Sequence, residues 1–199
     1  MALRRTCRAR KDLIAHRVAA TNQLRAHLQG VFPGALGLFC DLDSAISLAF
    51  LTRFECQDRA DWLSVKRLAS WLASVGYSGG VQAAELYARL VAARRGASGS
   101  HGAAQAHITR ALVALVSTLA EQIKTLTVQI SRQLAAHAGQ QIFTRLPGSG
   151  TVRAARLLVK IGECRGRFPT PESLACLAGV GPIHPTMWQE PCRGFPLGL

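Results

Sequence analysis

Acidic residues, aromatic residues and long hydrophobic segments are all scarce in this sequence. Only 11 Asp and Glu stand against 24 Lys and Arg, aromatics make up 6%, and apolar runs are short, such as residues 45–51, which Ser47 interrupts. A run this short cannot span a bilayer, so we expect no transmembrane segment and no membrane partner. The basic start leads into an amphipathic pattern, without the apolar core and cleavage site of a secretory signal.

Recognisable catalytic and metal-binding spacings are also lacking. The cysteines never form a C-x-x-C pair, which argues against a zinc cage or a disulfide framework and favours reduced thiols in a cytoplasmic protein. The histidines show no ligand spacing, and no G-x-S-x-G or phosphate-loop motif occurs. Ser149 lies in a glycine-flanked turn but has no base nearby in the sequence. We therefore expect no catalytic residue, no metal site and no cofactor in this chain.

What the sequence does contain is apolar bulk and positive charge. Its 199 residues are 49% apolar, enough to bury a core, and the abundance of Ala, Leu and Arg favours an all-α fold. The formal net charge of +13 predicts polyanionic partners, with nucleic acid first among them. The alternative is a basic protein whose charges are merely solvated.

Two long helices are predicted. Residues 1–38 form a basic connecting helix, in which apolar residues recur at seven-residue spacing and Gly30 and Pro33 end the pattern. Residues 101–140 form a long amphipathic helix, with apolar positions spaced 4, 3, 4, 4, 3, 4, 4 from Ile108 to Leu134. That eleven-residue repeat is typical of nearly straight packed helices. We expect the two helices to pair antiparallel within the chain, with dimerisation as the alternative.

Residues 39–100 are predicted to be a small helical insertion that ends in a Gly/Ser-rich linker. Asp43 or Ser44 is placed to cap one helix and Ser64 another. In the second of these, apolar residues recur at helical spacing from Val65 to Val75 before Gly76 stops the helix. The segment 94–102 is expected to be a linker or a flexible turn.

The most specific motif begins at residue 146 and reads LPGSG before a basic helix. Pro147 stiffens the turn, Gly148 and Gly150 permit close backbone approach, and the free amides at the helix start could hold a phosphate. On that helix Arg153, Arg156 and Lys160 fall at i, i+3 and i+7, which predicts a cationic stripe. The alternative is a tight turn between packed helices. A further helix is expected from Thr170-Pro171-Glu172, with Leu174, Leu177 and Val180 on its buried side.

Two segments carry a family resemblance. Residues 146–182, LPGSGTVRAARLLVKIGECRGRFPTPESLACLAGVGP, resemble the C-terminal block of insertion-sequence transposases of the IS-one-ten type, which are related to pilin-gene inverting recombinases. Residues 4–34, RRTCRARKDLIAHRVAATNQLRAHLQGVFPG, are similar to the connecting helix of the same family. The resemblance implies a bacterial protein of DNA transposition that is cytoplasmic and nucleoid-associated. It also implies a helix-hairpin-helix-like unit at residues 141–182.

The resemblance further implies groups that we do not find in this chain. The family has an N-terminal RuvC-like domain with four acidic metal ligands, a C-terminal serine nucleophile, and a guide-like RNA that brings two DNAs together. Mg²⁺ is thus expected only for the full-length family enzyme. The serine's position corresponds to Met187, within the irregular, proline-rich tail 183–199 that is unlike the family. We interpret the chain as a truncated fragment, with the tail typical of a frameshifted or prematurely ended reading frame.

The sequence therefore predicts an elongated all-α protein built on a coiled-coil-like pair of long helices, with a small helical insertion and a C-terminal helix-hairpin-helix-like unit. Its predicted role is to bind DNA, or alternatively structured RNA, through phosphates rather than bases. The predicted contact residues are Arg145, Gly148, Gly150, Arg153, Arg156 and Lys160, aided by Arg8 and Arg10. Two alternatives remain: an interaction scaffold that joins copies of itself or a full-length transposase, and a complete enzyme with an unconventional site.

Overall fold

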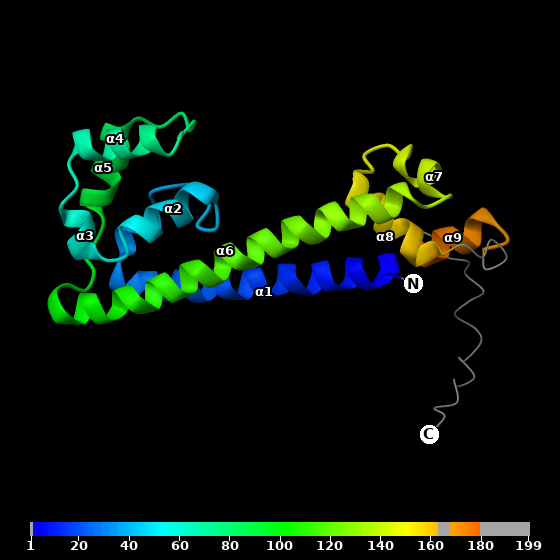
Figure 1. Ribbon diagram of the computed structural model, residues 1–199, viewed down its shortest axis with the longest axis horizontal. Helices are drawn as coiled ribbons and strands as arrows, with labels where there is room; N and C mark the ends of the chain where they lie inside the picture. Colours follow the sequence, from blue (N-terminus) through cyan, green and yellow to red (C-terminus); the bar gives the residue numbers. More distant parts are fainter. Residues whose placement is uncertain (1, 163–167, 180–199) are drawn as a thin grey trace, which may run out of the picture.

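The computed structural model describes residues 2–162 and 168–179. Over these residues the chain is all-α, as predicted, with no β-strand. Figure 1 shows a long two-helix arm with a block of shorter helices at one end and a smaller helical unit at the other. The helices are α1 (Ala2–Val31), α2 (Ala45–Arg53), α3 (Gln57–Asp61), α4 (Val65–Ser74), α5 (Ala83–Ala92), α6 (Gly99–Ala135), α7 (Gln140–Thr144), α8 (Thr151–Ile161) and α9 (Pro171–Ala178), with a short 3-10 helix at Pro33–Ala35.

The arm is an antiparallel pair of α1 and α6, which confirms the predicted intramolecular pairing. Two hydrogen bonds across the pair show the antiparallel order, because the residue earlier in α1 bonds to the residue later in α6. The Nε of Arg10 donates to Oγ1 of Thr127 at 2.7 Å, and Nε2 of His27 lies 3.0 Å from Oγ1 of Thr109. Burial lowers the pKa of His27, an effect opposed by the hydrogen bond of the imidazole to the backbone of Gln105. The imidazole is therefore kept neutral inside the arm.

The register of this pair differs from the eleven-residue repeat expected for α6. Most of its least exposed positions recur every seven residues, in two rows: Gly102, Thr109, Val116, Ile123 and Ile130, and Ala106, Val113, Ala120, Thr127 and Leu134. Leu112, a member of the expected stripe, is buried as well. Ile108 and Leu115, both expected in the buried stripe, are each 47% exposed. Small and β-branched residues allow the two backbones to approach closely, so burial follows the seven-residue spacing of a helix pair rather than side-chain size.

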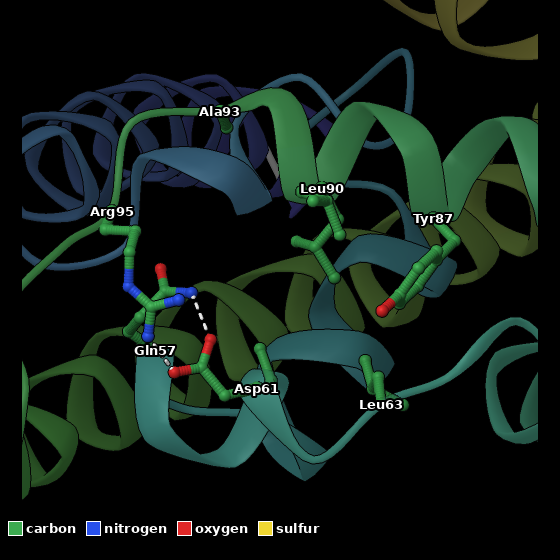
Figure 2. A pocket seen from close by; sticks show the side chains of 9 residues that line it. Gln57, Asp61, Leu63, Tyr87, Leu90, Ala93 and Arg95 are labelled. Atoms are coloured by element: carbon green, nitrogen blue, oxygen red, sulfur yellow. Dashed lines mark hydrogen bonds and ion pairs between the residues drawn. The ribbon is translucent and has the colours of Figure 1, made fainter.

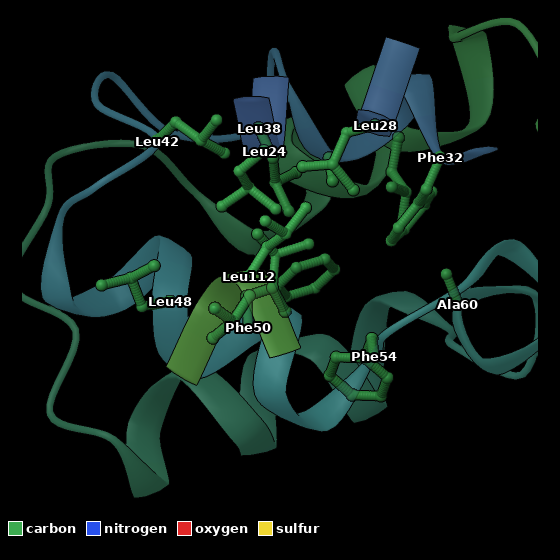
Figure 3. Close-up of a cluster of buried hydrophobic side chains, with 14 of the residues drawn as sticks. Leu24, Leu28, Phe32, Leu38, Leu42, Leu48, Phe50, Phe54, Ala60 and Leu112 are labelled. Atoms are coloured by element: carbon green, nitrogen blue, oxygen red, sulfur yellow. The ribbon is translucent and has the colours of Figure 1, made fainter. Parts of the chain in front are cut away.

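The shorter helices α2 to α5 form what we call the middle block. The main hydrophobic core lies where this block packs on the arm (Figure 3). Phe50 of α2 is only 1% exposed and is surrounded by the rings of Phe32, Phe39, Phe54 and Trp71, with centroids 5.0 to 6.2 Å away. Such tilted and edge-on ring contacts add to the free energy gained by burying aromatic area. The middle block is thus anchored by an aromatic cluster that includes Phe32, directly after α1, and aliphatic side chains of α6 such as Leu112 belong to the same core.

The predicted helix starts of the middle block and of α9 are confirmed. The hydroxyl oxygens of Ser44, Ser64 and Thr170 each accept a hydrogen bond from the backbone N–H three residues later. The buried sides were predicted less well. On α4, Leu68 and Leu72 are buried but Val65 and Val75 are exposed.

On α9, Leu174 and Leu177 are also exposed, contrary to prediction, and Val180 lies outside the described residues. The long helix α6 packs mainly against α1, α2 and α8, so α9 is not among its main neighbours. No residue of α9 whose side chain the structure describes is buried, so the predicted buried side is not found there.

The Gly/Ser-rich segment 94–102 contacts both α1 and α3, and α6 already begins at Gly99. Gly96 lies so close to α1 that a Cβ there would be 1.8 Å from the carbonyl oxygen of Val31. The next residue, Ala97, donates its N–H to that same oxygen at 3.1 Å. At the start of α6, the N–H of Gly99 is bound by Oδ2 of Asp58 at 2.9 Å. The middle block thus determines where the long helix begins.

Among the described helices, α6 has the length and apolar composition of a membrane-crossing helix, although the short apolar run at residues 45–51 predicted none. Core helices of soluble proteins meet the same criterion. Here α6 packs along the arginine-rich α1, as Figure 1 shows.

Candidate nucleic-acid interface

The basic helix α8 is held against the end of the arm by a second, smaller apolar cluster. Ala154, Ala155 and Leu158 of α8 are buried together with Ile130 and Leu134 of α6 and Phe143 of α7. Because one side of α8 is buried, its opposite side faces solvent. Arg153, Arg156 and Lys160 are exposed there, which is the stripe expected from their spacing.

The first turns of α1 lie beside α8 and bring a second set of cations. Arg4, Arg8 and Lys11 are spaced by four and three residues, so they share one face of α1. Leu3 and Cys7, on the neighbouring face, pack against the second apolar cluster. The two helices enclose a groove of about 400 Å³ lined by Arg4, Cys7, Arg8, Lys11, Asp12, Arg156, Val159 and Lys160, which we call the basic groove.

The basic groove is strongly electropositive. Five of its eight lining residues are Lys or Arg, and Asp12 is its single acid. The surrounding arm reinforces this field. Residues 2–31 and 99–162 together contain 14 Lys and Arg against two acids, Asp12 and Glu121, whereas residues 32–98 contain seven Lys and Arg against six acids. The net charge of the protein is therefore concentrated on the arm and on α8, where the groove lies.

Cys7 lies in the basic groove, partly covered by the packing of α1 on α8. Burial raises the pKa of its thiol, and the nearby guanidinium groups of Arg156 and Arg10 oppose that increase. The thiol therefore remains protonated at neutral pH and reacts more slowly than an exposed cysteine.

The predicted contact residues do not form one surface. Arg8, Arg156 and Lys160 line the basic groove, together with Arg4 and Lys11, which were not among the predicted contacts. The spacing of four and three residues could have predicted this, because it places Arg4 and Lys11 on one face of α1 with Arg8.

Arg10 belongs to the helix pair instead, because it is half-buried and its Nε bonds to Thr127 inside the arm. The reason is its position in the sequence. It falls in one row of the seven-residue pattern, with Leu3 and Arg17, and so faces α6.

The turn before α8 holds the remaining predicted residues, outside the lining of the basic groove. Gly148 has a φ of +68°, and Ser149 donates its N–H to the carbonyl oxygen of Leu146 at 3.0 Å. Nη1 of Arg153 bends back to the carbonyl oxygen of Gly148 at 3.1 Å, so this guanidinium also stabilises the turn. Gly150 precedes the first turn of α8 without a side-chain cap, and Arg145 is exposed at the end of α7.

Potential metal ligands lie apart from one another in the part of the chain that the structure covers. There, no group of three or more His, Cys, Asp or Glu residues could hold a metal ion. The acids serve other roles: Asp58 caps α6, Asp61 pairs with Arg95, and Asp43 pairs with Arg17 at 3.2 Å. The hydroxyl oxygen of Ser149 is shielded from solvent and has no hydrogen-bond partner among the described residues. Met187 and the tail 183–199 lie outside them.

Comparison with known proteins adds a family to this geometry. Residues 140–185 match the model of the transposase IS116/IS110/IS902 family. This match covers α7, α8 and α9, including the helix that supplies Arg156 and Lys160 to the basic groove. Over these residues the chain is similar to this transposase family.

Two relatives from Streptomyces coelicolor are also similar to the chain. The mini-circle putative transposase for IS117 is 27% identical over 190 residues, which cover 88% of this chain and 44% of the relative. An uncharacterised 43.6 kDa protein of insertion element IS110 is 36% identical over 75 residues, 38% of the chain and 18% of the relative. The chain thus spans less than half the length of either relative in these matches. No solved structure matches it.

Proposed function

We propose that this chain is a nucleic-acid-binding part of an insertion-sequence transposase, acting in the bacterial cytoplasm at the nucleoid, and that it has no catalytic groups of its own. The observation that carries the proposal is the basic groove, where five cations from two helices more than 140 residues apart in the sequence converge. A phosphodiester backbone is the ligand that such a row of cations fits best. Similarity to the transposase family supports a role in transposition.

Within this proposal, the groove residues Arg4, Arg8, Lys11, Arg156 and Lys160 contact phosphates. The turn at Gly148 and Gly150, in a helix-hairpin-helix-like arrangement of α7 and α8, holds a further phosphate at the amides of α8. Arg145 lies beside that turn, whereas Arg153 and Arg10 act mainly by stabilising the turn and the helix pair. Phosphate contacts position nucleic acid without reading its bases, so the binding is not sequence-specific.

Binding to a 20-base-pair DNA duplex, followed by fluorescence anisotropy at several salt concentrations, tests the proposal. Each phosphate contact contributes about −0.9 to the slope of log K against log salt, so replacing two groove cations flattens the slope by roughly 2. The test variant is Arg156→Gln with Lys160→Gln. The control is Arg53→Gln with Arg94→Gln, which removes the same charge from the middle block. Equal effects of the two double variants, or an affinity independent of salt, would refute the proposal.

We expect the nucleic acid held in the groove to be DNA, because the matching family consists of transposases. Structured RNA is the alternative ligand. A helical RNA hairpin measured beside the duplex separates the two. Tighter binding of the hairpin by at least tenfold at equal salt would assign the groove to RNA.

A second candidate function, self-association, is favoured by a different observation. Ile108 and Leu115 lie seven residues apart and expose an apolar row on α6. Such a row is typical of a helix that packs against another helix. The chain would then act as a scaffold that joins copies of itself or a full-length transposase. Leu115→Glu should lower the sedimentation coefficient at micromolar concentration if the row is an interface, and leave it unchanged if it is not.

A further inference from the structure

Trp62 is an exposed aromatic residue with an unusual neighbour. It follows the last residue of α3 and is 62% exposed, although large aromatic side chains are usually covered in folded proteins. The guanidinium carbon of Arg67 lies 3.7 Å from the centre of its ring, and Nη1 of Arg67 donates to the backbone oxygen of Trp62 at 2.8 Å. Arg67 therefore covers one face of the indole and holds the ring in place. Much of the surface of Trp62 remains open to solvent.

The acids nearest to Trp62, Asp58 and Asp61, have partners within the fold. Oδ2 of Asp58 accepts the N–H of Gly99, and Asp61 bonds to Gln57 and Arg95. Figure 2 shows these partners of Asp61 beside a small cavity between α3 and α5. Both acids are exposed, but each carboxylate already has a hydrogen-bond partner within the protein.

Two nearby cations, unlike Asp61, are not ion-paired within the described part of the chain. Arg59 and Lys66, three residues before and four after Trp62, are exposed and form no ion pair with any residue that the structure describes. Together with Arg67 they place three cations within five residues of the indole. An open aromatic ring flanked by cations is the combination that single-stranded nucleic acids bind.

We propose that Trp62 and Arg67 form a stacking site for an unpaired nucleobase, with Arg59 and Lys66 contacting the flanking phosphates. The inference rests on the proposed nucleic-acid-binding function but concerns a separate surface. In Figure 1 the turn between α3 and α4 lies at the opposite end of the arm from α8. A base within a duplex already stacks on its neighbours, so the ligand of this site is single-stranded DNA or RNA.

A protein partner would fit the same surface less well. Residues that dominate the energetics of protein interfaces are surrounded by packed neighbours that exclude water. Around Trp62, however, the exposed neighbours at positions 59, 66 and 67 are charged, and among the flanking residues Val65 supplies apolar area at 40% exposure. The surroundings therefore favour a polyanion with one planar group over an apolar protein surface.

The test compares a 20-nucleotide oligothymidylate with a 20-base-pair duplex, both binding to the full chain. Trp62→Ala should weaken oligothymidylate binding about 5- to 100-fold, the usual loss on removing one stacking ring, and change duplex affinity less than twofold. Trp62→Phe, which keeps a ring, should retain most of the affinity. Val91→Ala is the matched control, because Val91 of α5 is 64% exposed and has no part in the site. A melting curve of each variant verifies that it is folded.

The failure of this inference can be told apart from that of the basic groove. If the double variant Arg156→Gln with Lys160→Gln loses duplex binding while Trp62→Ala binds oligothymidylate normally, the groove stands and the stacking site is refuted. If Trp62→Ala instead lowers the sedimentation coefficient without affecting oligothymidylate, the surface is a protein contact and the inference is again overturned. Photocrosslinking of 5-bromodeoxyuridine in the oligonucleotide to Trp62 would support the site directly.

Discussion

Gly96→Ala tests whether the turn before α6 is fixed by close contact with α1. The new Cβ would lie 1.8 Å from the carbonyl oxygen of Val31, whereas ordinary contacts begin at about 3.4 Å. One backbone must then move by about 1.5 Å, because close-packed interiors have no spare volume to absorb the overlap. Such a shift breaks the hydrogen bond between Ala97 and Val31 and strains that between Gly99 and Asp58.

The expected cost follows from these contacts. Breaking one of these hydrogen bonds, straining the other and creating the steric overlap should together lower the unfolding free energy by about 2–4 kcal/mol. For a chain of this length that corresponds to a melting temperature lowered by roughly 5–15 °C. Urea and thermal unfolding followed by circular dichroism measure both quantities. A Gly96→Ala protein within about 0.5 kcal/mol of the wild type would refute the close-contact argument.

The control changes the same residue type where the structure leaves room. Gly30 lies in the last turn of α1, and a Cβ there would meet nothing within 4 Å. Alanine forms helix more readily than glycine, so Gly30→Ala should stabilise the protein by up to about 1 kcal/mol. Opposite signs for the two substitutions are the expected result, and a loss of stability in both would show that glycine is required for another reason.

Three further predictions concern the core, the arm and the basic groove. Phe50→Ala should cost about 3–5 kcal/mol of unfolding free energy and Phe50→Leu under about 2 kcal/mol, since leucine fills much of the space; equal costs in urea unfolding would contradict the aromatic core. His27 has a lowered pKa, so the folded chain binds fewer protons than the unfolded chain, and stability falls as pH drops through about 6.5. Unfolding at pH 7.5 and 5.5 should show a smaller loss for His27→Gln than for the wild type, and an equal loss would disprove the assignment. Cys7 should be alkylated by iodoacetamide at pH 7.5 more slowly than exposed Cys40, and duplex DNA should slow Cys7 alone, as read by peptide mass spectrometry. Protection of both cysteines, or of neither, would place the DNA elsewhere.

Local patterns were sufficient for much of the fold. The helix starts at Ser44, Ser64 and Thr170 could be predicted because capping depends on residues only three positions apart. The two long helices could be predicted because their apolar residues recur over several turns. The exposed cations of α8 followed in the same way from spacing within one helix.

Contacts between distant segments could not be read in this way. In α6 the sequence pattern gave weight to large side chains such as Ile108 and Leu115, while the interface uses Gly102, Ala106 and Thr109 because close helix packing favours small residues. The exposed Trp62 gave no periodic signal, and its pairing with Arg67 depends on the turn between α3 and α4.

The sequence by itself determined the helical class, the helix starts and the excess of positive charge, because each depends on composition or on residues a few positions apart. Only the tertiary structure decided which cations act together. Arg10 and Arg8 are two residues apart, yet one bonds within the arm and the other lines the basic groove with Arg156. The reason is rotation about the helix axis: a step of two residues turns a side chain by about 200°. The packing of α1 on α6 and α8 then decides which side is buried.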